Sequence, residues 1–135
     1  MPTSKTKIPT GDSKEDVYIR RAIIVERLYP LIGKSVPCGA FKGQQVKFEF
    51  ASIDETATHA AKYYDSTLAA LRVVDALKRS VLVKTDNPQS NKQKKMNFKK
   101  VHELSSYLKN IGEIKRIVGE RSNTKIIHYC ITKKE

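Results

Sequence analysis

Residues 52–83, SIDETATHAAKYYDSTLAALRVVDALKRSVLV, contain the patterns that decide the fold of this chain. Ser52 followed three residues later by Glu55 matches a capping box, so we expect a helix to begin at Ser52. A polar Asp-Ser pair at 65–66 interrupts the helical pattern and is suited to cap a second helix. The apolar run at 81–83 suits a buried strand. The stretch therefore predicts two consecutive helices that lead into a strand.

The first of these helices is predicted to have two different faces. At 100° per residue, its apolar face carries Ile53, Ala57, Ala60, Ala61 and Tyr64. The opposite face carries Glu55, Thr58, His59 and Lys62. Residues four apart meet on a helix surface, so an acid, an imidazole and an amine share one polar stripe.

The composition bounds the class of protein and of partner. A chain of 135 residues is expected to form one domain with its own core. Its 26 lysines and arginines against 14 acids give a net charge of +12, which favours polyanionic partners. Nucleic acid is the first candidate, ahead of an anionic membrane and an acidic inhibitor protein. Basic charge that serves only solubility is the simpler alternative.

Several classes of protein have no support in the sequence. There is no apolar run of transmembrane length and no apolar segment of a secretory signal near the N-terminus, so we expect no membrane partner. Cys38 and Cys130 lack CxxC spacing, which argues against structural zinc and fits free thiols in a reducing cytoplasm. Nucleotide-loop, HExxH and GxSxG motifs are missing, so no cofactor is expected.

The N-terminal half is expected to contain a tail, a helix and a hairpin. Residues 1–14 have the composition of a disordered tail, and 15–135 form the single domain. A helix is expected over 15–29, because Pro30 pushes the preceding residue out of helical geometry. Alternation over 45–50 predicts a strand, with a short partner at 35–38.

The C-terminal half is expected to complete the sheet. Residues 85–99 are rich in lysine and asparagine and predict a long flexible loop. Residues 113–118 and 125–132 are expected to be paired strands. Residues 101–110 fit a strand or a helix. The whole pattern predicts an α+β fold, with N-terminal helices packed on a mostly antiparallel sheet.

The polar residues suggest acid–base chemistry without a metal. His59, Glu55 and Lys62 on the predicted stripe, with His128 on the last strand, could move the two protons that RNA cleavage requires. A solvated face with a weak ion pair is the simpler explanation of the stripe, and a satisfied strand histidine is the simpler explanation of His128. His102 has the weakest case among the three histidines.

A second set of residues is expected to contact phosphates rather than to catalyse. Lysine and arginine side chains on a loop and on neighbouring strands add affinity that does not depend on base sequence and weakens with salt. The expected contacts are Lys92, Lys94, Lys95, Lys99, Lys100, Arg116 and Arg121.

Residues of about 35–133 resemble the barnase–EndoU–colicin–RelE-like nuclease domains of phage, conjugative-element and polymorphic-toxin proteins. The most specific parts of the resemblance are ETATH at 55–59 and IIHYCIT at 126–132. The resemblance implies helices on a four-stranded antiparallel sheet and a metal-independent endoribonuclease acting on RNA, with tRNA as one candidate. It also implies that the 55–62 stripe lies near the cleft, opposite the last strands.

Two other functions fit the same residues. If 101–110 is a helix, then 113–132 becomes the wing of a winged-helix protein that binds nucleic acid without cleaving it. Alternatively, the basic surface belongs to an interaction module that binds an acidic immunity or host protein.

Overall fold

The computed structural model describes residues 7–42, 44–87 and 97–121, and the backbone of 126–133. Its helices lie in the first two thirds of the chain, before the long strands. They are α1 (Lys14–Leu28), α2 (Phe50–Ala60), α3 (Tyr64–Leu71) and α4 (Val73–Lys78), with short 3-10 turns η2 (Tyr29–Leu31) and η3 (Gly39–Phe41).

Six strands form one mixed sheet in the order β1-β2-β6-β5-β4-β3. The strands are β1 (Ser35–Pro37), β2 (Gln45–Lys47), β3 (Val81–Asp86), β4 (Phe98–Leu108), β5 (Gly112–Arg121) and β6 (Ile126–Lys133). All neighbours pair antiparallel except β2 and β6, which are parallel. The predicted α+β class, the early hairpin and the mostly antiparallel sheet are therefore confirmed.

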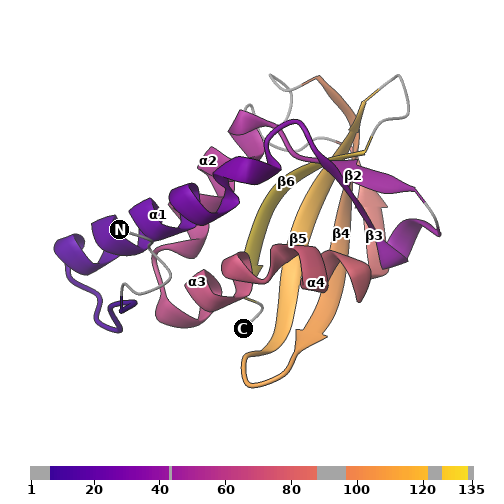
Figure 1. The fold of residues 1–135 in the computed structure, drawn as a ribbon. Helices are drawn as coiled ribbons and strands as arrows, with labels where there is room; N and C mark the ends of the chain where they lie inside the picture. Colours follow the sequence, from indigo (N-terminus) through magenta and orange to yellow (C-terminus); the bar gives the residue numbers. More distant parts are fainter. Residues whose placement is uncertain (1–6, 43, 88–96, 122–125, 134–135) are drawn as a thin grey trace.

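The helices pack against one face of this sheet (Figure 1). Helix α2 lies on β6 and against α1, while α4 lies near β1 and β4. The side chains between the layers are almost completely buried and include Ile24, Phe48, Ile53, Leu77, Leu104, Leu108 and Ile114. On the opposite face no helix of the described chain covers β4 and β5, and Tyr107 is 68% exposed.

Helix α2 begins earlier than predicted, and Ser52 is not its N-cap residue. The helix begins at Phe50, and Glu49 is the residue whose side chain accepts from the first turn. Ser52 sits at the third helical position, where its Oγ accepts from the backbone N–H of Glu49 at 3.2 Å. The predicted strand over 45–50 is correspondingly wrong beyond Lys47, because the cap turns the chain into the helix.

The second predicted helix and the strand after it also need correction. The helix breaks at Arg72, whose φ and ψ of −109° and 27° leave the helical region, so α3 and α4 are separate. Strand β3 is exposed along its length, with Val81 at 61%, instead of buried. It is the edge of the sheet and pairs only with β4.

Residues 98–108 form β4, which settles the ambiguity over 101–110 in favour of a strand. The strand pairs along its length with β5 and carries Leu104 and Leu108 into the core. A winged-helix protein needs a recognition helix there, so that alternative is wrong.

Arg20 on α1 forms hydrogen bonds with two other parts of the chain, the segment before α1 and the end of α2. Its side chain is completely buried. Nε donates to Ala61 O at 2.8 Å and Nη2 to Lys62 O at 3.3 Å, at the end of α2. Nη1 donates to Pro9 O at 2.9 Å and Gly11 O at 2.5 Å. Because the segment before α1 is held in this way, the predicted disorder of residues 1–14 does not hold for 9–13.

We expect Arg20→Met to lower the free energy of unfolding by roughly 3 kcal/mol, because it removes the donors to buried carbonyls. Arg20→Lys should recover only part of this loss, since an ammonium cannot match the planar fork of donors. Urea unfolding followed by circular dichroism measures both. Arg21→Met is the matched control, because its ion pair with Asp54 is half-exposed and should contribute less than about 1 kcal/mol. Equal losses at the two arginines would contradict this role for Arg20.

Candidate functional site

Glu55 and His59 meet on α2, as their spacing predicted. His59 Nε2 lies 3.2 Å from Glu55 Oε2. The two side chains differ strongly in burial, with 41% of the imidazole exposed but only 5% of the carboxylate. The prediction that Glu55 lies on the solvent face is therefore wrong: it belongs to the edge of the buried arc of α2, and His59 borders on solvent.

This geometry suits proton transfer by the imidazole. A carboxylate oxygen can only accept, so His59 carries a proton on Nε2 in this contact. In the neutral ring Nδ1 is then the basic atom, and the carboxylate stabilises the imidazolium that forms when Nδ1 takes a proton. The pair is thus a carboxylate-oriented histidine with one nitrogen for a substrate.

Lys62 and His128 are less directly placed relative to this pair. Helix α2 ends at Ala60, so Lys62 lies on an exposed turn and the argument from a shared stripe fails for it. The backbone of His128 lies in β6 and pairs with Val118 of β5. Its side chain is outside the described residues. Helix α2 packs on β6, the strand that carries His128. Whether the side chains of His128 and His59 converge stays a prediction.

His102, the weakest candidate from sequence, makes the most complete set of contacts among the described histidines. Its Nδ1 lies 2.8 Å from Thr85 Oγ1 and its Nε2 lies 2.9 Å from Glu120 Oε1. Phe41 packs edge-on against the ring, with 5.1 Å between ring centres. These partners come from β3, β5 and the 3-10 turn η3. Only the registers of β3, β4 and β5 bring them together, so no local pattern could have revealed them.

The hydrogen bonds around His102 have a defined direction. Glu120 accepts from Nε2–H, which leaves Nδ1 of the neutral ring to accept from the hydroxyl of Thr85. Thr85 also lines a polar hollow of about 270 Å³ with Asp86, Asn87 and Lys100. A hydroxyl, an imidazole and a carboxylate are thus in series. All three are already paired with one another, which also fits a structural link between strands.

The two histidine–glutamate pairs lie near opposite ends of α2. Glu49 at the start of α2 forms two hydrogen bonds with Arg121, the residue after Glu120. His59 is ten residues further along, about 15 Å at 1.5 Å per residue. This spacing along α2 indicates two separate candidate sites.

The predicted nucleic-acid contacts have different environments. Lys99 and Lys100 are exposed at the start of β4, whereas Lys92, Lys94 and Lys95 lie outside the described residues. Arg121 is engaged by Glu49 at 2.9 and 3.0 Å and lies 5.6 Å from the centre of the Phe98 ring. Its guanidinium is therefore already used to join β5 to the start of α2.

Arg116 does not fit its predicted role at the surface. Its side chain is completely buried on β5, and Nη2 donates to Ser106 Oγ. Within the described residues, Nε and Nη1 have no hydrogen-bond partner. Burial away from water disfavours the charged form and lowers the pKa of Arg116 to about 10. A phosphate could not reach this side chain without opening the core.

Comparisons with protein-family models, curated proteins and solved structures gave no match to this chain. Among the residues that the structure describes, no three His, Cys, Asp or Glu side chains are grouped closely enough to hold a metal ion. None of the described helices has the length and apolar character needed to cross a membrane. The site must therefore be interpreted from its own chemistry.

We expect Thr85→Val to change the hydrogen bonding of His102 while keeping the shape of the side chain. Removing this part-buried hydrogen bond should lower the free energy of unfolding by about 1 kcal/mol. In wild type, ¹⁵N-edited NMR should find the Nε2–H tautomer of His102, and the variant should show an altered Nδ1 resonance. Thr58→Val, at an exposed position of α2, is the control. A protonated Nδ1 and a deprotonated Nε2 in wild type would contradict the assigned directions.

We expect Arg116→Met to unfold with a free energy about 2 kcal/mol higher than wild type at pH 7. Burial of the cation is costly, and among the described residues the hydrogen bond to Ser106 opposes the gain. The native pKa of Arg116, about 10, lies below the ordinary value of an arginine, so the unfolded chain holds the extra proton above pH 10 and wild type gains stability there. The difference in unfolding free energy between Arg116→Met and wild type should therefore shrink by about 1 kcal/mol between pH 10 and 11 in urea titrations. A variant less stable than wild type at pH 7 would show that the charge is compensated.

Proposed function

We propose that this chain is a small basic domain that cleaves RNA without a metal ion. The observation that carries the proposal is the Glu55–His59 pair, in which a nearly buried carboxylate orients a half-exposed imidazole. The net charge of +12 supports it, because a protein of this charge attracts a polyanionic substrate. The resemblance to the barnase–EndoU–colicin–RelE-like nucleases supports the same activity.

In the proposed reaction, neutral His59 removes the proton of a ribose 2′-hydroxyl at Nδ1. The 2′-oxygen attacks the adjacent phosphorus, the bond to the 5′-oxygen breaks, and a 2′,3′-cyclic phosphate remains. Glu55 stabilises the imidazolium through Nε2–H. We assign His128 the role of the acid that protonates the leaving 5′-oxygen, and Lys62 the role of a cation near the phosphate.

The exposed lysines supply affinity in this proposal. Lys99 and Lys100 at the start of β4, with the lysines of 92–95, would hold the backbone of RNA and make binding weaken steeply with salt. Structured RNA such as tRNA is the proposed substrate class. A mobile genetic element as the source and an acidic immunity or host protein as a partner belong to the same proposal.

The direct test is cleavage of total tRNA by the purified full chain in EDTA. We expect His59→Ala to lower the rate by roughly 10² to 10⁴, the usual contribution of general acid–base catalysis. Glu55→Gln should have a smaller effect, because the imidazole remains but loses its oriented partner. Thr58→Ala, on the exposed side of the same turn, should cleave like wild type.

His102→Asn separates the two candidate histidines. If its fold is intact by circular dichroism, this variant should retain cleavage. RNA that binds without being cut, or equal rates in wild type and His59→Ala, would make the chain a binding module instead. Loss of cleavage in His102→Asn with full activity in His59→Ala would move the chemistry to the other site and overturn the assignment to Glu55 and His59.

A further inference from the structure

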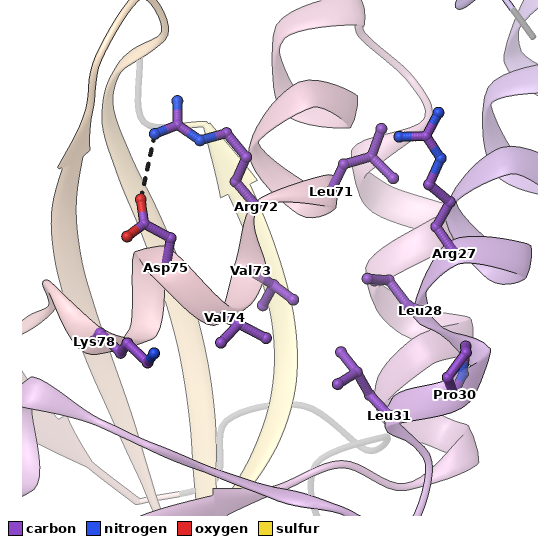
Figure 2. Close-up of a pocket in the computed structure, with 10 residues that line it drawn as sticks. All are labelled: Arg27, Leu28, Pro30, Leu31, Leu71, Arg72, Val73, Val74, Asp75 and Lys78. Atoms are coloured by element: carbon purple, nitrogen blue, oxygen red, sulfur yellow. Dashed lines mark hydrogen bonds and ion pairs between the residues drawn. The ribbon is translucent and has the colours of Figure 1, made fainter. Parts of the chain in front are cut away.

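A hollow of about 480 Å³ lies between the end of α1 and the α3–α4 segment (Figure 2), and neither histidine–glutamate pair is among its lining residues. We call it the α1–α4 groove. Its apolar lining comes from Leu28, Pro30, Leu31, Leu71, Val73 and Val74. Its charged residues are Arg27, Arg72, Asp75 and Lys78.

The apolar lining of the α1–α4 groove is continuous with the core but remains partly open. Leu28 and Val73 are buried, whereas Leu31, Leu71 and Val74 are half-buried and pack against the core cluster. Figure 2 shows aliphatic side chains from η2 and α4 facing the same space. The break at Arg72 is one reason for the opening, because it divides what would otherwise be one helix across this side of the sheet. Aliphatic side chains of a partner would gain by entering the space.

The charge around the α1–α4 groove is positive. Its one acid, Asp75, lies 3.3 Å from Arg72 and 3.1 Å from Arg79. The hydrogen bond from Arg79, with a further contribution from Arg72, holds the pKa of this carboxyl below its ordinary value, so it stays ionised and is compensated. Lys78 on α4 is exposed and adds a cation, and Arg27 on α1 adds a second positive charge although it has an interaction of its own. The rim therefore complements a negatively charged ligand.

The apolar lining and the positive rim of the α1–α4 groove together favour one class of ligand over others. A nucleic acid would meet the cations, but a lining of aliphatic side chains offers its bases no stacking or hydrogen bonds. A second copy of the chain would bring another net charge of +12, which the positive rim would repel. The chain segments outside the described residues contain a single acid, at 135, and so cannot supply a negatively charged insert. An acidic segment of another protein matches both the apolar lining and the positive rim.

We propose that the α1–α4 groove binds an acidic amphipathic segment of a partner protein. Aliphatic side chains of the segment occupy the space between Leu31 and Val74, and its carboxylates pair with Lys78 and lie in the positive field of Arg27 and Arg72. A helix with anchors three and four residues apart is the form that such grooves usually accept. This interaction uses a surface distinct from the proposed cleavage site and does not depend on it.

A synthetic peptide of about four helical turns, with leucines on one face and glutamates on the other, is the probe. Fluorescence anisotropy should show binding to the full chain. Arg27→Glu with Lys78→Glu should weaken it at least about tenfold, a loss of 1.4 kcal/mol. The matched control is Lys14→Glu with Lys34→Glu, which makes the same change in net charge at exposed positions outside the groove and should cost less than threefold.

Peptide and single-residue controls separate the two parts of the proposal. Val74→Thr and a peptide with serine in place of leucine should each weaken binding, and Lys78→Glu alone should weaken it more than Lys34→Glu alone. Methyl NMR resonances of Leu31, Leu71 and Val74 should shift on peptide addition. No peptide binding, equal loss in the two charge-reversed doubles, or a selective loss of poly-U binding in the groove variant would each overturn the proposal.

Discussion

The buried guanidinium of Arg20 is the constraint on which the arrangement of the helices depends. Four backbone carbonyls from two distant segments accept its hydrogen bonds, two before α1 and two after α2. Carbonyls at the end of a helix lack partners within the helix, so the arginine satisfies groups that α2 would otherwise leave unpaired. In doing so it holds the turn that follows α2 against α1. His59 lies in the last turn of that helix, and its position is therefore linked to a residue that is not part of the site.

Four of the buried polar residues differ in how far hydrogen bonds offset the cost of their burial. Arg20 is satisfied by carbonyls, and His102 by a hydroxyl and a carboxylate. Glu55 is nearly buried but faces an imidazole that reaches solvent. Arg116 has two nitrogens with no partner among the described residues. His102 is enclosed and paired at both ring nitrogens, whereas the imidazole of His59 is half-exposed, which gives it access to a substrate in our proposal. This contrast is the physical reason for preferring Glu55 and His59 over His102 as the reactive pair.

The sequence predicted the features that local patterns determine. The helix ended by Pro30, the hairpin near 35–47 and the meeting of Glu55 with His59 follow from spacing within a few residues. The errors arise where tertiary context decides. An apolar run at 81–83 looks like a buried strand, but its position at the sheet edge exposes it. The alternation of Arg116 placed it on a strand and gave no indication of which face the helices would cover. The partners of His102 depend on register across three strands, which no single segment encodes.

The distribution of charge over the molecule argues against a single function for the whole basic surface. Lys99 and Lys100 lie at the start of β4, whereas Arg27 and Lys78 border an apolar groove between helices. Phosphate contacts need cations on an open, polar surface, because water and counterions must be released from the backbone of the nucleic acid. Cations around aliphatic side chains are instead suited to a ligand that has both carboxylates and apolar groups. In our two proposals, the net charge of +12 therefore serves two surfaces with different chemistry.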